Sequence, residues 1–449
     1  MSKDIRIKKG LDIKLVGEAE QITTEISTSG VYALKPEDFH GIIPKLIAKE
    51  GTEVKAGEAL FYSKSDERIL FPSPVSGKVT EIVRGAKRKI LTMKILADGK
   101  QEYQDFGKQD ADKMSGEEVK NHLFTSGCWP FVKQRPYDVI ANPNQAPKAI
   151  FISAYASAPL AAEYDYTLAG KEKELQVALT AVSKLTEGKV HVSIGQNSNS
   201  PFNGLNNIEL HKVSGPHPVG NVSTQIAQID PLNKGEVVWV VTPQDLVVIG
   251  ELFLTGNFNA KRTIALTGSQ FEKPSYVTAI AGASMSEVVK KNLKNDNTRV
   301  VSGNVLSGTQ VAEDGFLGFY DNQVTAIPEG DDYEFFGWNK PVFNKISTSR
   351  ALTFSWLTPK KKYDLNTNTN GEHRAFVVTG SYENVFPLDV YPLQFLKSCM
   401  YKDLDEMENL GGYEVAPEDF ALTEFICVSK QPHQKIVREG LDLMREELG

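Results

Sequence analysis

A strand–helix–strand pattern in the middle of the chain narrows the fold more than any other feature. Residues 148–155 (KAIFISAY) and 190–195 (VHVSIG) are short apolar runs typical of buried strands, and residues 171–187 repeat apolar side chains at helical spacing. Two strands joined through a helix lie parallel in one sheet, with a right-handed crossover. Because a further strand and helix follow in 236–254, the pattern predicts a Rossmann-like α/β domain over residues 101–256.

This domain lacks the usual nucleotide signature. A dinucleotide fold normally carries G-x-G-x-x-G after its first strand, so that backbone amides can approach phosphate. The chain contains neither that motif nor G-x-x-x-x-G-K-[ST]. Only ordinary helix N-termini remain as phosphate-binding features, so we expect an α/β domain without a nucleotide motif.

Residues 43–96 predict an all-β module, because short β-rich runs alternate there with Gly, Pro and Ser. The order E-G-T-x-V-K-x-G-E-x-L, then a polar turn, then P-S-P-V-S-G-K-V resembles the biotinyl/lipoyl-like barrel sandwich. We assign this domain to residues 1–100. Lys64 lies near the tip where carrier proteins of that group hold a swinging cofactor. Its polar neighbours favour a solvated turn lysine instead.

Two further modules follow. Residues 257–330 have the order strand, strand, helix, strand, which predicts a β-grasp module. Residues 331–449 begin with a mixed region and a polar loop at 365–373 (LNTNTNGEH) and then become helical. The fold class expected is multidomain α/β and β with a C-terminal helical domain.

Composition excludes several functions. The 449 residues carry a net charge of −7, and without a dominant basic face nucleic-acid binding is disfavoured. The three cysteines lie far apart, which suits a reducing compartment rather than a disulfide framework. The most apolar window is broken by Pro243, Asp245 and Glu251, so no membrane span is expected. We expect a soluble chain that is held at a membrane only through a partner.

Several segments together resemble one family. They are IKKGLDIKLVGEAEQ, RGAKR, SGPHPVGN, TPQDLVVIGELFLTG, GEHRAFVVTGSYENVFPLDVYPLQFL and EDFALTEFICVSK, and they spread over nearly the whole chain. They resemble the A-subunit family of the Na⁺-translocating NADH:quinone oxidoreductase. More distantly, the chain is similar to the C-subunit of the electron-transfer complex and to the flavin-bearing, NADH-oxidising subunit of respiratory complex I.

The resemblance implies that this chain lacks three cofactor-binding features of the distant relatives. Their glycine-rich flavin loop is replaced by 127–138 (GCWPFVKQRPYD), and their acidic loop by 153–159 (SAYASAP). Where they carry cluster cysteines, this chain has 384–392 (NVFPLDVYP) and a single Cys427. We therefore expect no flavin, no tight NADH site and no iron–sulfur cluster, and a helical domain that resembles a cluster domain without its cysteines.

One aromatic and basic run is the candidate quinone contact, because a quinone is a flat ring with two carbonyl acceptors. The candidate residues are Trp129, Phe131, Lys133, Arg135, Tyr137 and Tyr155. The alternative is that these side chains fill the space of the lost flavin. In either case the aromatic side chains should lie in a groove at the carboxyl edge of the sheet, with Ser153 and Pro159 facing it. Lys133 and Arg135 should lie at its mouth with their charges in water.

Other reactive residue types have simpler interpretations. His211 and His217 would need a third ligand to hold zinc, so no metal site is expected. Cys427 is interpreted as a buried structural thiol. No catalytic residue is predicted in this chain.

The resemblance implies a peripheral, cytoplasmic subunit of a six-subunit sodium pump on the inner membrane. That complex oxidises NADH and reduces ubiquinone or a related quinone, and its redox cofactors would belong to the other membrane and peripheral subunits. This chain would contribute to quinone binding and assembly, or act as a purely structural docking scaffold. The isolated chain would not be catalytic.

Overall fold

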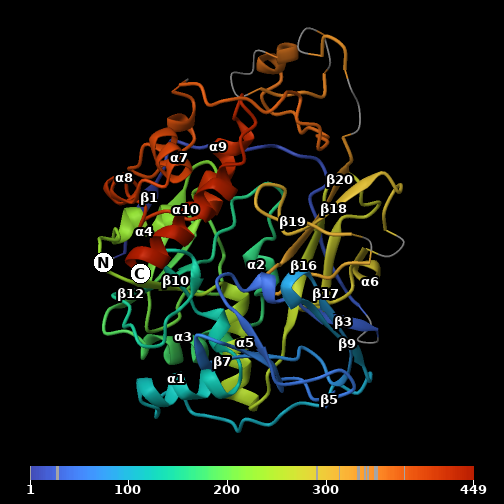
Figure 1. Ribbon diagram of the computed structural model, residues 1–449, viewed down its shortest axis with the longest axis vertical. Coiled ribbons are helices and arrows are strands. Elements are labelled where there is room, and N and C mark those ends of the chain that lie inside the picture. Colours follow the sequence, from blue (N-terminus) through green and yellow to red (C-terminus); the bar gives the residue numbers. More distant parts are fainter. Residues whose placement is uncertain are drawn as a thin grey trace.

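The computed structural model describes residues 2–26, 30–289, 292–312, 314–330, 334–337, 340, 343–347, 352–378 and 380–449 (Figure 1). Within these ranges the strands form sheets of seven, six, four and three strands. No helix in the described ranges is both long and apolar enough to cross a bilayer. The chain is a multidomain protein of mixed α/β and β structure, as expected.

Two small sheets form the first β module. Their strands, in spatial order, are β3 (Val31–Leu34), β9 (Ile90–Ala97), β8 (Gly77–Arg84) and β5 (Glu53–Val54) in one sheet, and β4 (Pro44–Leu46), β6 (Ala59–Ser63) and β7 (Asp66–Pro72) in the other. Phe61, Phe71, Val79 and Ile95 from both sheets are buried in one core. Lys64 is exposed in the turn between β6 and β7.

The seven-stranded sheet organises the α/β domain. Its order is β1 (Asp4–Arg6), β14 (Glu209–Ser214), β13 (Lys189–Gly195), β12 (Ala149–Ser153), β15 (Val238–Val240), β10 (Lys133–Arg135) and β11 (Val139–Ile140). The first five strands are parallel, and β10 and β11 form an antiparallel hairpin at the edge. The predicted strand–helix–strand unit is therefore present, with α3 (Glu172–Ser183) between β12 and β13.

Helices cover both faces of this sheet. Because successive strand residues point to opposite faces, Ile150 and Ile152 of β12 belong to one apolar cluster and Ala149 and Phe151 to another. The first cluster contains side chains of α1 (Gly116–Thr125), α3 and α5 (Pro243–Thr255). The second contains those of α4 (Val222–Ile229). A capping box of Ser115 and Glu118 opens α1.

A six-stranded sheet forms the third module. Its order is β19 (Thr309–Gln310), β18 (Thr298–Ser302), β20 (Gln323–Pro328), β16 (Lys261–Thr267), β17 (Ser275–Ile280) and β2 (Glu20–Glu25), with α6 (Met285–Val289) between β17 and β18. The strands β1 and β2 both precede the first β module in sequence. They pair instead with the sheets of the second and third modules. Residues 4–25, which we call the N-terminal strap, therefore connect these two sheets.

The C-terminal module, at the upper left of Figure 1, is helical. Its helices are α7 (Pro392–Tyr401), α8 (Leu404–Asn409), α9 (Ala421–Phe425) and α10 (His433–Leu448). Their apolar side chains form a separate core that includes Phe395, Phe420, Leu441 and Met444. The remaining helical segments are α2 (Tyr164–Thr167) and 3-10 turns at Pro36–Asp38, Ala86–Arg88, Trp129–Phe131, Leu352–Leu357, Tyr382–Asn384 and Pro417–Phe420.

Gly250 sets the distance between α5 and α3. A Cβ atom at this position would lie 1.9 Å from the carbonyl oxygen of Glu174. We expect Gly250→Ala to push the helices apart and to lower the free energy of unfolding by about 1–3 kcal/mol, the usual cost of overpacking. Denaturant unfolding measures this change. Lys173→Ala on the exposed side of α3 is the control, and equal effects of the two variants would contradict the tight contact.

Candidate functional site

Three segments meet at the carboxyl edge of the parallel sheet, which is where open α/β sheets bind ligands. Residues 154–162 follow β12, and residues 215–221 follow β14. Residues 129–132 lead into β10, which runs antiparallel to β15 and pairs Lys133 with Val240. These segments contain three of the six candidate quinone contacts, Trp129, Phe131 and Tyr155.

Trp129 lies inside the protein at this edge and is 0% exposed. Its indole N–H donates to the carbonyl oxygen of Ala141 at 2.9 Å. Its ring meets Trp239 edge-on at 5.3 Å between ring centroids and lies 4.6 Å from Phe124. The indole nitrogen and the aromatic ring of Trp129 thus both make their contacts within the protein.

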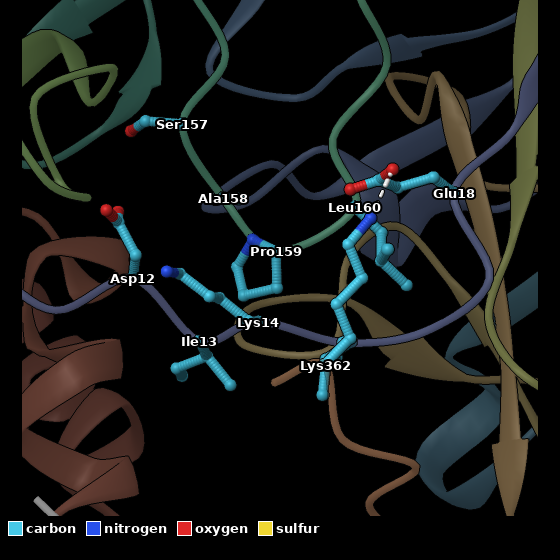
Figure 2. A pocket seen from close by; sticks show the side chains of 10 residues that line it. Asp12, Ile13, Lys14, Glu18, Ser157, Ala158, Pro159, Leu160 and Lys362 are labelled. Atoms are coloured by element: carbon cyan, nitrogen blue, oxygen red, sulfur yellow. Dashed lines mark ion pairs between the residues drawn. The ribbon is translucent and has the colours of Figure 1, made fainter. Parts of the chain in front are cut away.

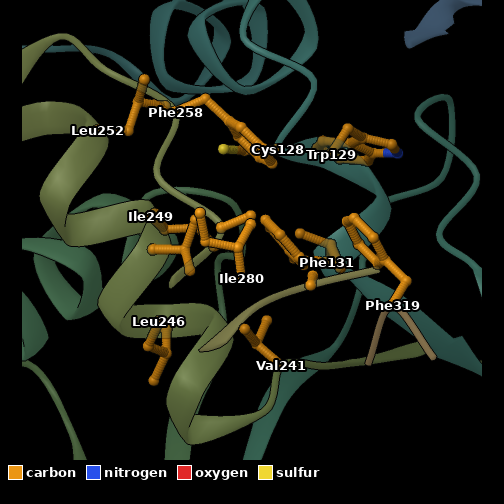
Figure 3. Close-up of a cluster of buried hydrophobic side chains, with 14 of the residues drawn as sticks. Cys128, Trp129, Phe131, Val241, Leu246, Ile249, Leu252, Phe258, Ile280 and Phe319 are labelled. Atoms are coloured by element: carbon orange, nitrogen blue, oxygen red, sulfur yellow. The ribbon is translucent and has the colours of Figure 1, made fainter. Parts of the chain in front are cut away.

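Phe131 belongs to a column of aromatic rings that crosses three modules, and Figure 3 shows its members Phe131, Phe258 and Phe319. It is 1% exposed, and its ring lies near-parallel to those of Phe258 and Phe319, at centroid distances of 6.1 and 5.3 Å. Phe319 in turn lies 4.8 Å from Phe39, and Phe39 lies 4.4 Å from Phe71 of the first β module. Phenylalanines from three modules therefore fill the space beside β15.

A buried ion pair lies next to this column. The Arg262 guanidinium donates to a carboxylate oxygen of Asp245 at 2.5 Å, and both side chains are 1% exposed. The Thr242 hydroxyl donates to the other carboxylate oxygen at 2.6 Å. The guanidinium also faces the Phe131 ring at 5.6 Å. The positive charge of Arg262 is therefore balanced by groups inside the protein and is not available to a ligand.

Lys133 is half-buried and borders the same region. Its ammonium group lies 4.1 Å from the ring centroid of Tyr320. The Tyr320 hydroxyl donates to the carbonyl oxygen of Pro130 at 2.6 Å, and burial raises the pKa of this phenol well above its usual range. Lys133 thus keeps partial access to water.

The structure places Arg135 and Tyr137 differently from the prediction. Arg135 pairs with Val238 at the amino end of β15, so the turn between β10 and β11 points away from the carboxyl edge. Arg135 is 4% exposed and forms ion pairs with Asp138 and with Glu418, the latter at 3.0 Å. The expectation that its charge lies in water at the mouth of a groove is wrong, because the turn is covered by the C-terminal module.

Tyr137 lies in that turn and is buried against the C-terminal module. Its ring is 6.2 Å from that of Tyr413, and its carbonyl oxygen accepts a hydrogen bond from Arg438 at 2.8 Å. Tyr137 therefore does not share one groove with Trp129 and Phe131, and the expectation that it does is wrong. Burial alone would raise the pKa of the neighbouring Asp138, but the cations Arg135, Lys133 and Arg438 together outweigh burial and lower it to about 2.

The loops after β12 and β14 are locked together by hydrogen bonds. The Ser157 hydroxyl lies 2.9 Å from Nδ1 of His217 and accepts the Gly220 N–H at 2.8 Å. The Ser153 hydroxyl donates to the Gly220 carbonyl oxygen at 2.7 Å. A Cβ atom at Gly220 would lie 2.5 Å from the Tyr155 carbonyl oxygen, so only glycine fits here. Tyr155 itself is half-buried.

Ser157 and His217 resemble a nucleophile and its base, but the third group is placed otherwise. In such a constellation a carboxylate orients the imidazole ring. Here the Asp12 carboxylate accepts the backbone N–H of His217 at 2.9 Å, not a ring N–H. These contacts tie the N-terminal strap to the sheet and do not favour nucleophilic catalysis.

A small polar cavity of about 180 Å³ opens beside this loop (Figure 2). Its lining includes Asp12, Lys14, Glu18, Ser157, Pro159 and Lys362. The Lys362 ammonium pairs with Glu18 at 2.6 Å, and the Lys14 ammonium donates to the Pro359 carbonyl oxygen at 3.3 Å. The cavity is smaller than the roughly 300 Å³ at which ligand pockets begin, and its charges are largely compensated.

A larger, open cavity of about 950 Å³ lies at the opposite, amino edge of the sheet. Its lining includes Lys120, Lys148 and Lys184. Lys148 pairs with Asp230 at 3.0 Å and with Glu236 at 2.7 Å, and Lys120 pairs with Glu117 at 3.1 Å. No sequence pattern indicates this cavity, because its lysines come from segments far apart in sequence. Their pairing also means that it is not a strong anion site.

Comparison with known proteins matches most of these elements to three described domain families. Residues 5–98 match the family described as the NqrA N-terminal barrel-sandwich hybrid domain, residues 114–258 the NqrA second alpha/beta domain, and residues 263–313 the NQRA C-terminal domain. The first match confirms the barrel-sandwich prediction.

Full-length relatives decide the family. The chain is 36% identical over 447 residues to the A-subunit of the Na(+)-translocating NADH-quinone reductase from Neisseria meningitidis serogroup B, covering 99% of this chain and 100% of that protein. It is 35% identical over 446 residues to the protein of the same name from Yersinia pestis, with the same coverage. The chain belongs to the A-subunit family of the Na⁺-translocating NADH-quinone reductase. The predicted family is confirmed.

Among solved structures, the NAD⁺-reducing NiFe hydrogenase in its air-oxidized state is similar to this chain only weakly. The identity is 12% and the TM-score 0.31, over 45% of this chain and 43% of that chain. A likeness at this level supports no inference about this member of the reductase family.

Two histidines of this family member meet across β13 and β14. Nδ1 of His191 lies 2.9 Å from Nε2 of His211, and Glu209 completes a group whose ligand-type atoms lie within 4.8 Å of one another. The backbone N–H of Lys3 donates to Nδ1 of His211 at 3.1 Å, so this ring carries its proton on Nε2. A metal-binding histidine normally donates its second ring N–H. The arrangement therefore suits a neutral hydrogen-bonded pair better than a metal site.

The cysteines lie in apolar cores. Cys427 is fully buried, and its sulfur accepts the Tyr382 hydroxyl at 3.0 Å, which agrees with its interpretation as a structural thiol. Burial raises the pKa of both Cys128 and Cys399 to about 12, so neither is a reactive thiolate at neutral pH.

His217 makes the stability of this edge depend on pH. Burial lowers its pKa to about 4, whereas an unfolded histidine titrates near 6.5. Between these values the unfolded chain binds the proton and the folded chain does not. The contribution of His217 is therefore fully present above about pH 6.5 and is lost progressively as the pH falls toward 4, by about 3 kcal/mol.

We expect His217→Gln to reduce the acid loss of stability between pH 7 and pH 4. His211 and His433 also have pKa values lowered to about 4 by burial, so part of the loss will remain. Thermal melting across this pH range measures the difference. The exposed His373→Gln variant should behave as the wild type, and a His217→Gln profile equal to it would contradict the prediction.

Proposed function

We propose that this chain is a peripheral, cytoplasmic subunit of a sodium-pumping NADH:quinone reductase that has no redox cofactor of its own. The name of the relatives supplies the complex and its reaction. The observation that carries the cofactor part of the proposal is the aromatic column. Phe131 comes from the segment that leads into β10 at the carboxyl end of β15, and its ring packs between Phe258 and Phe319 with 1% exposure, which leaves no room for a flavin or nucleotide ring beside it.

Of the two roles weighed from the sequence, docking is the one that the packing supports better. Trp129 and Phe131 have almost no exposed surface, and Arg135 and Tyr137 bind the C-terminal module. Side chains committed in this way give the modules fixed relative positions. A rigid multidomain surface is what a scaffold for the other membrane and peripheral subunits requires.

Contribution to a quinone site remains the second candidate. Lys133 and Tyr155 are half-buried, and each could add a donor to a site completed by another protein of the complex. These two side chains would then be held in place by the packing of Trp129, Phe131, Arg135 and Tyr137.

The same proposal includes the finer fold assignment. We infer that residues 101–256 form a Rossmann-like domain and residues 257–330 a β-grasp module, both kept for shape. The five parallel strands with helices on both faces support the first, and the mixed sheet of β16, β17, β18 and β20 with α6 supports the second.

Phe131→Ala separates the two roles. If Phe131 is packing, the variant should lose about 3–5 kcal/mol of unfolding free energy and leave a cavity. Titration of the isolated chain with a soluble short-tail quinone, followed by tryptophan fluorescence, should show no saturable quenching below about millimolar concentration. Saturable quenching that Phe131→Ala abolishes, with little loss of stability, would support the quinone role instead. Val247→Ala, at a half-buried position of α5, controls for a general packing defect.

The absence of a cofactor is tested by purification of the chain itself. The protein should show no flavin absorbance and no broad iron–sulfur absorbance, and metal analysis should find no stoichiometric iron. Stoichiometric flavin that survives gel filtration would show that the aromatic column opens, and the cofactor-free role would have to be abandoned.

A further inference from the structure

The hairpin between β8 and β9 ends in a cluster of cations that the proposed role does not use. Arg84, Lys87, Arg88 and Lys89 lie within six residues, and all four are exposed. The chain carries a net charge of −7, so this tip has the opposite sign to the chain as a whole. Within the described part of the protein, no ion pair joins any of the four to a carboxylate. The nearest acid along the hairpin, Glu81, pairs with Lys94 at 2.8 Å.

The backbone at the tip is strained. The Lys89 N–H donates to the Ala86 carbonyl oxygen at 3.1 Å and closes a turn whose two central residues are Lys87 and Arg88. Both have left-handed backbone conformations, with φ of 54° and 61°. A turn of this kind favours Asn-Gly, because side chains with a Cβ and long stems tolerate positive φ poorly. Two long cations therefore occupy the positions where uncharged, unstrained residues would fit best.

Strain that is kept at an exposed site indicates a function for the side chains that cause it. Two further hydrogen bonds stabilise the turn. The Gly85 N–H donates to the Lys89 carbonyl oxygen at 2.8 Å, and the Arg84 guanidinium donates to the Arg88 carbonyl oxygen at 3.2 Å. Lys87, Arg88 and Lys89 remain as free charges on a rigid support. Their position on the hairpin tip lets all three reach one surface.

We propose that this tip binds the anionic headgroups of a lipid bilayer. Between Arg84 and Lys89 the only other residues are Gly85 and Ala86, so the tip lacks the apolar centre that a stable protein interface needs. Clustered lysines and arginines without apolar neighbours are instead attracted to negatively charged membrane surfaces, each cation adding to the attraction. Because four exposed cations are concentrated at the tip, it also sets which side of the protein faces the membrane. This inference goes beyond the proposed role, because it requires no other subunit.

Sedimentation of the full chain with lipid vesicles tests the proposal. Binding should be strong to vesicles that contain phosphatidylglycerol, weak to pure phosphatidylcholine, and should fall as the salt concentration rises. The double variant Lys87→Asn with Arg88→Gly removes two charges and relaxes the turn. It should bind the anionic vesicles at least about tenfold more weakly, while its melting temperature is unchanged or higher.

A matched variant distinguishes an effect of the tip on vesicle binding from an effect of the net charge of the protein. Lys45→Gln with Lys49→Gln also removes two exposed charges from the first β module and should bind like the wild type. Equal loss of binding in both double variants, or equal binding of the wild type to both kinds of vesicle, would overturn the proposal. Capture of the tip by an acidic polypeptide such as polyglutamate, with no preference for anionic vesicles, would assign a protein partner and overturn it as well.

Discussion

Most of the structure depends on one packing arrangement, the aromatic column from Phe71 through Phe39, Phe319 and Phe131 to Phe258. Its members come from the barrel-sandwich module, the α/β domain and the six-stranded sheet. Rings at 4.4–6.1 Å allow little rearrangement, because interiors packed this densely do not deform continuously. Three modules that could otherwise hinge against one another therefore share one core, and the edge that binds ligands in other α/β sheets becomes a joint.

Buried charges reinforce the joints between modules. Arg262 of β16 pairs with Asp245 of α5, and Arg135 of the edge hairpin pairs with Glu418 next to α9. Such pairs add little net stability, because Arg135, Asp245 and Arg262 must lose their water, whereas Glu418 stays partly exposed. Misplacing either partner would leave an uncompensated buried charge, however. The pairs thus specify the relative position of the modules, which the apolar column alone would specify less strictly.

Features encoded locally could be predicted from the sequence, and features set by register could not. The capping box of α1 and the apolar run of β12 depend on neighbours a few residues apart, and both are present. The direction of Arg135 and Tyr137 depends on where the β10–β11 hairpin turns, which the sequence pattern left open. The contact between His191 and His211 requires β13 and β14 to lie side by side with Ser193 opposite His211, which only the sheet reveals. The burial of Trp129 and Phe131 likewise depends on Phe258 and Phe319, which are far away in sequence.

The N-terminal strap has a consequence for synthesis on the ribosome. β1 needs β14, about 200 residues later, and β2 needs β17, about 250 residues later, as parallel partners. The barrel-sandwich module lies between them in sequence and can close as soon as β9 has emerged. The first 25 residues must therefore remain unpaired while about half of the chain is translated, and both sheets acquire their edge strands late. A nascent chain of this family exposes two strand-forming segments for that whole interval, so its need for chaperones should be greatest then.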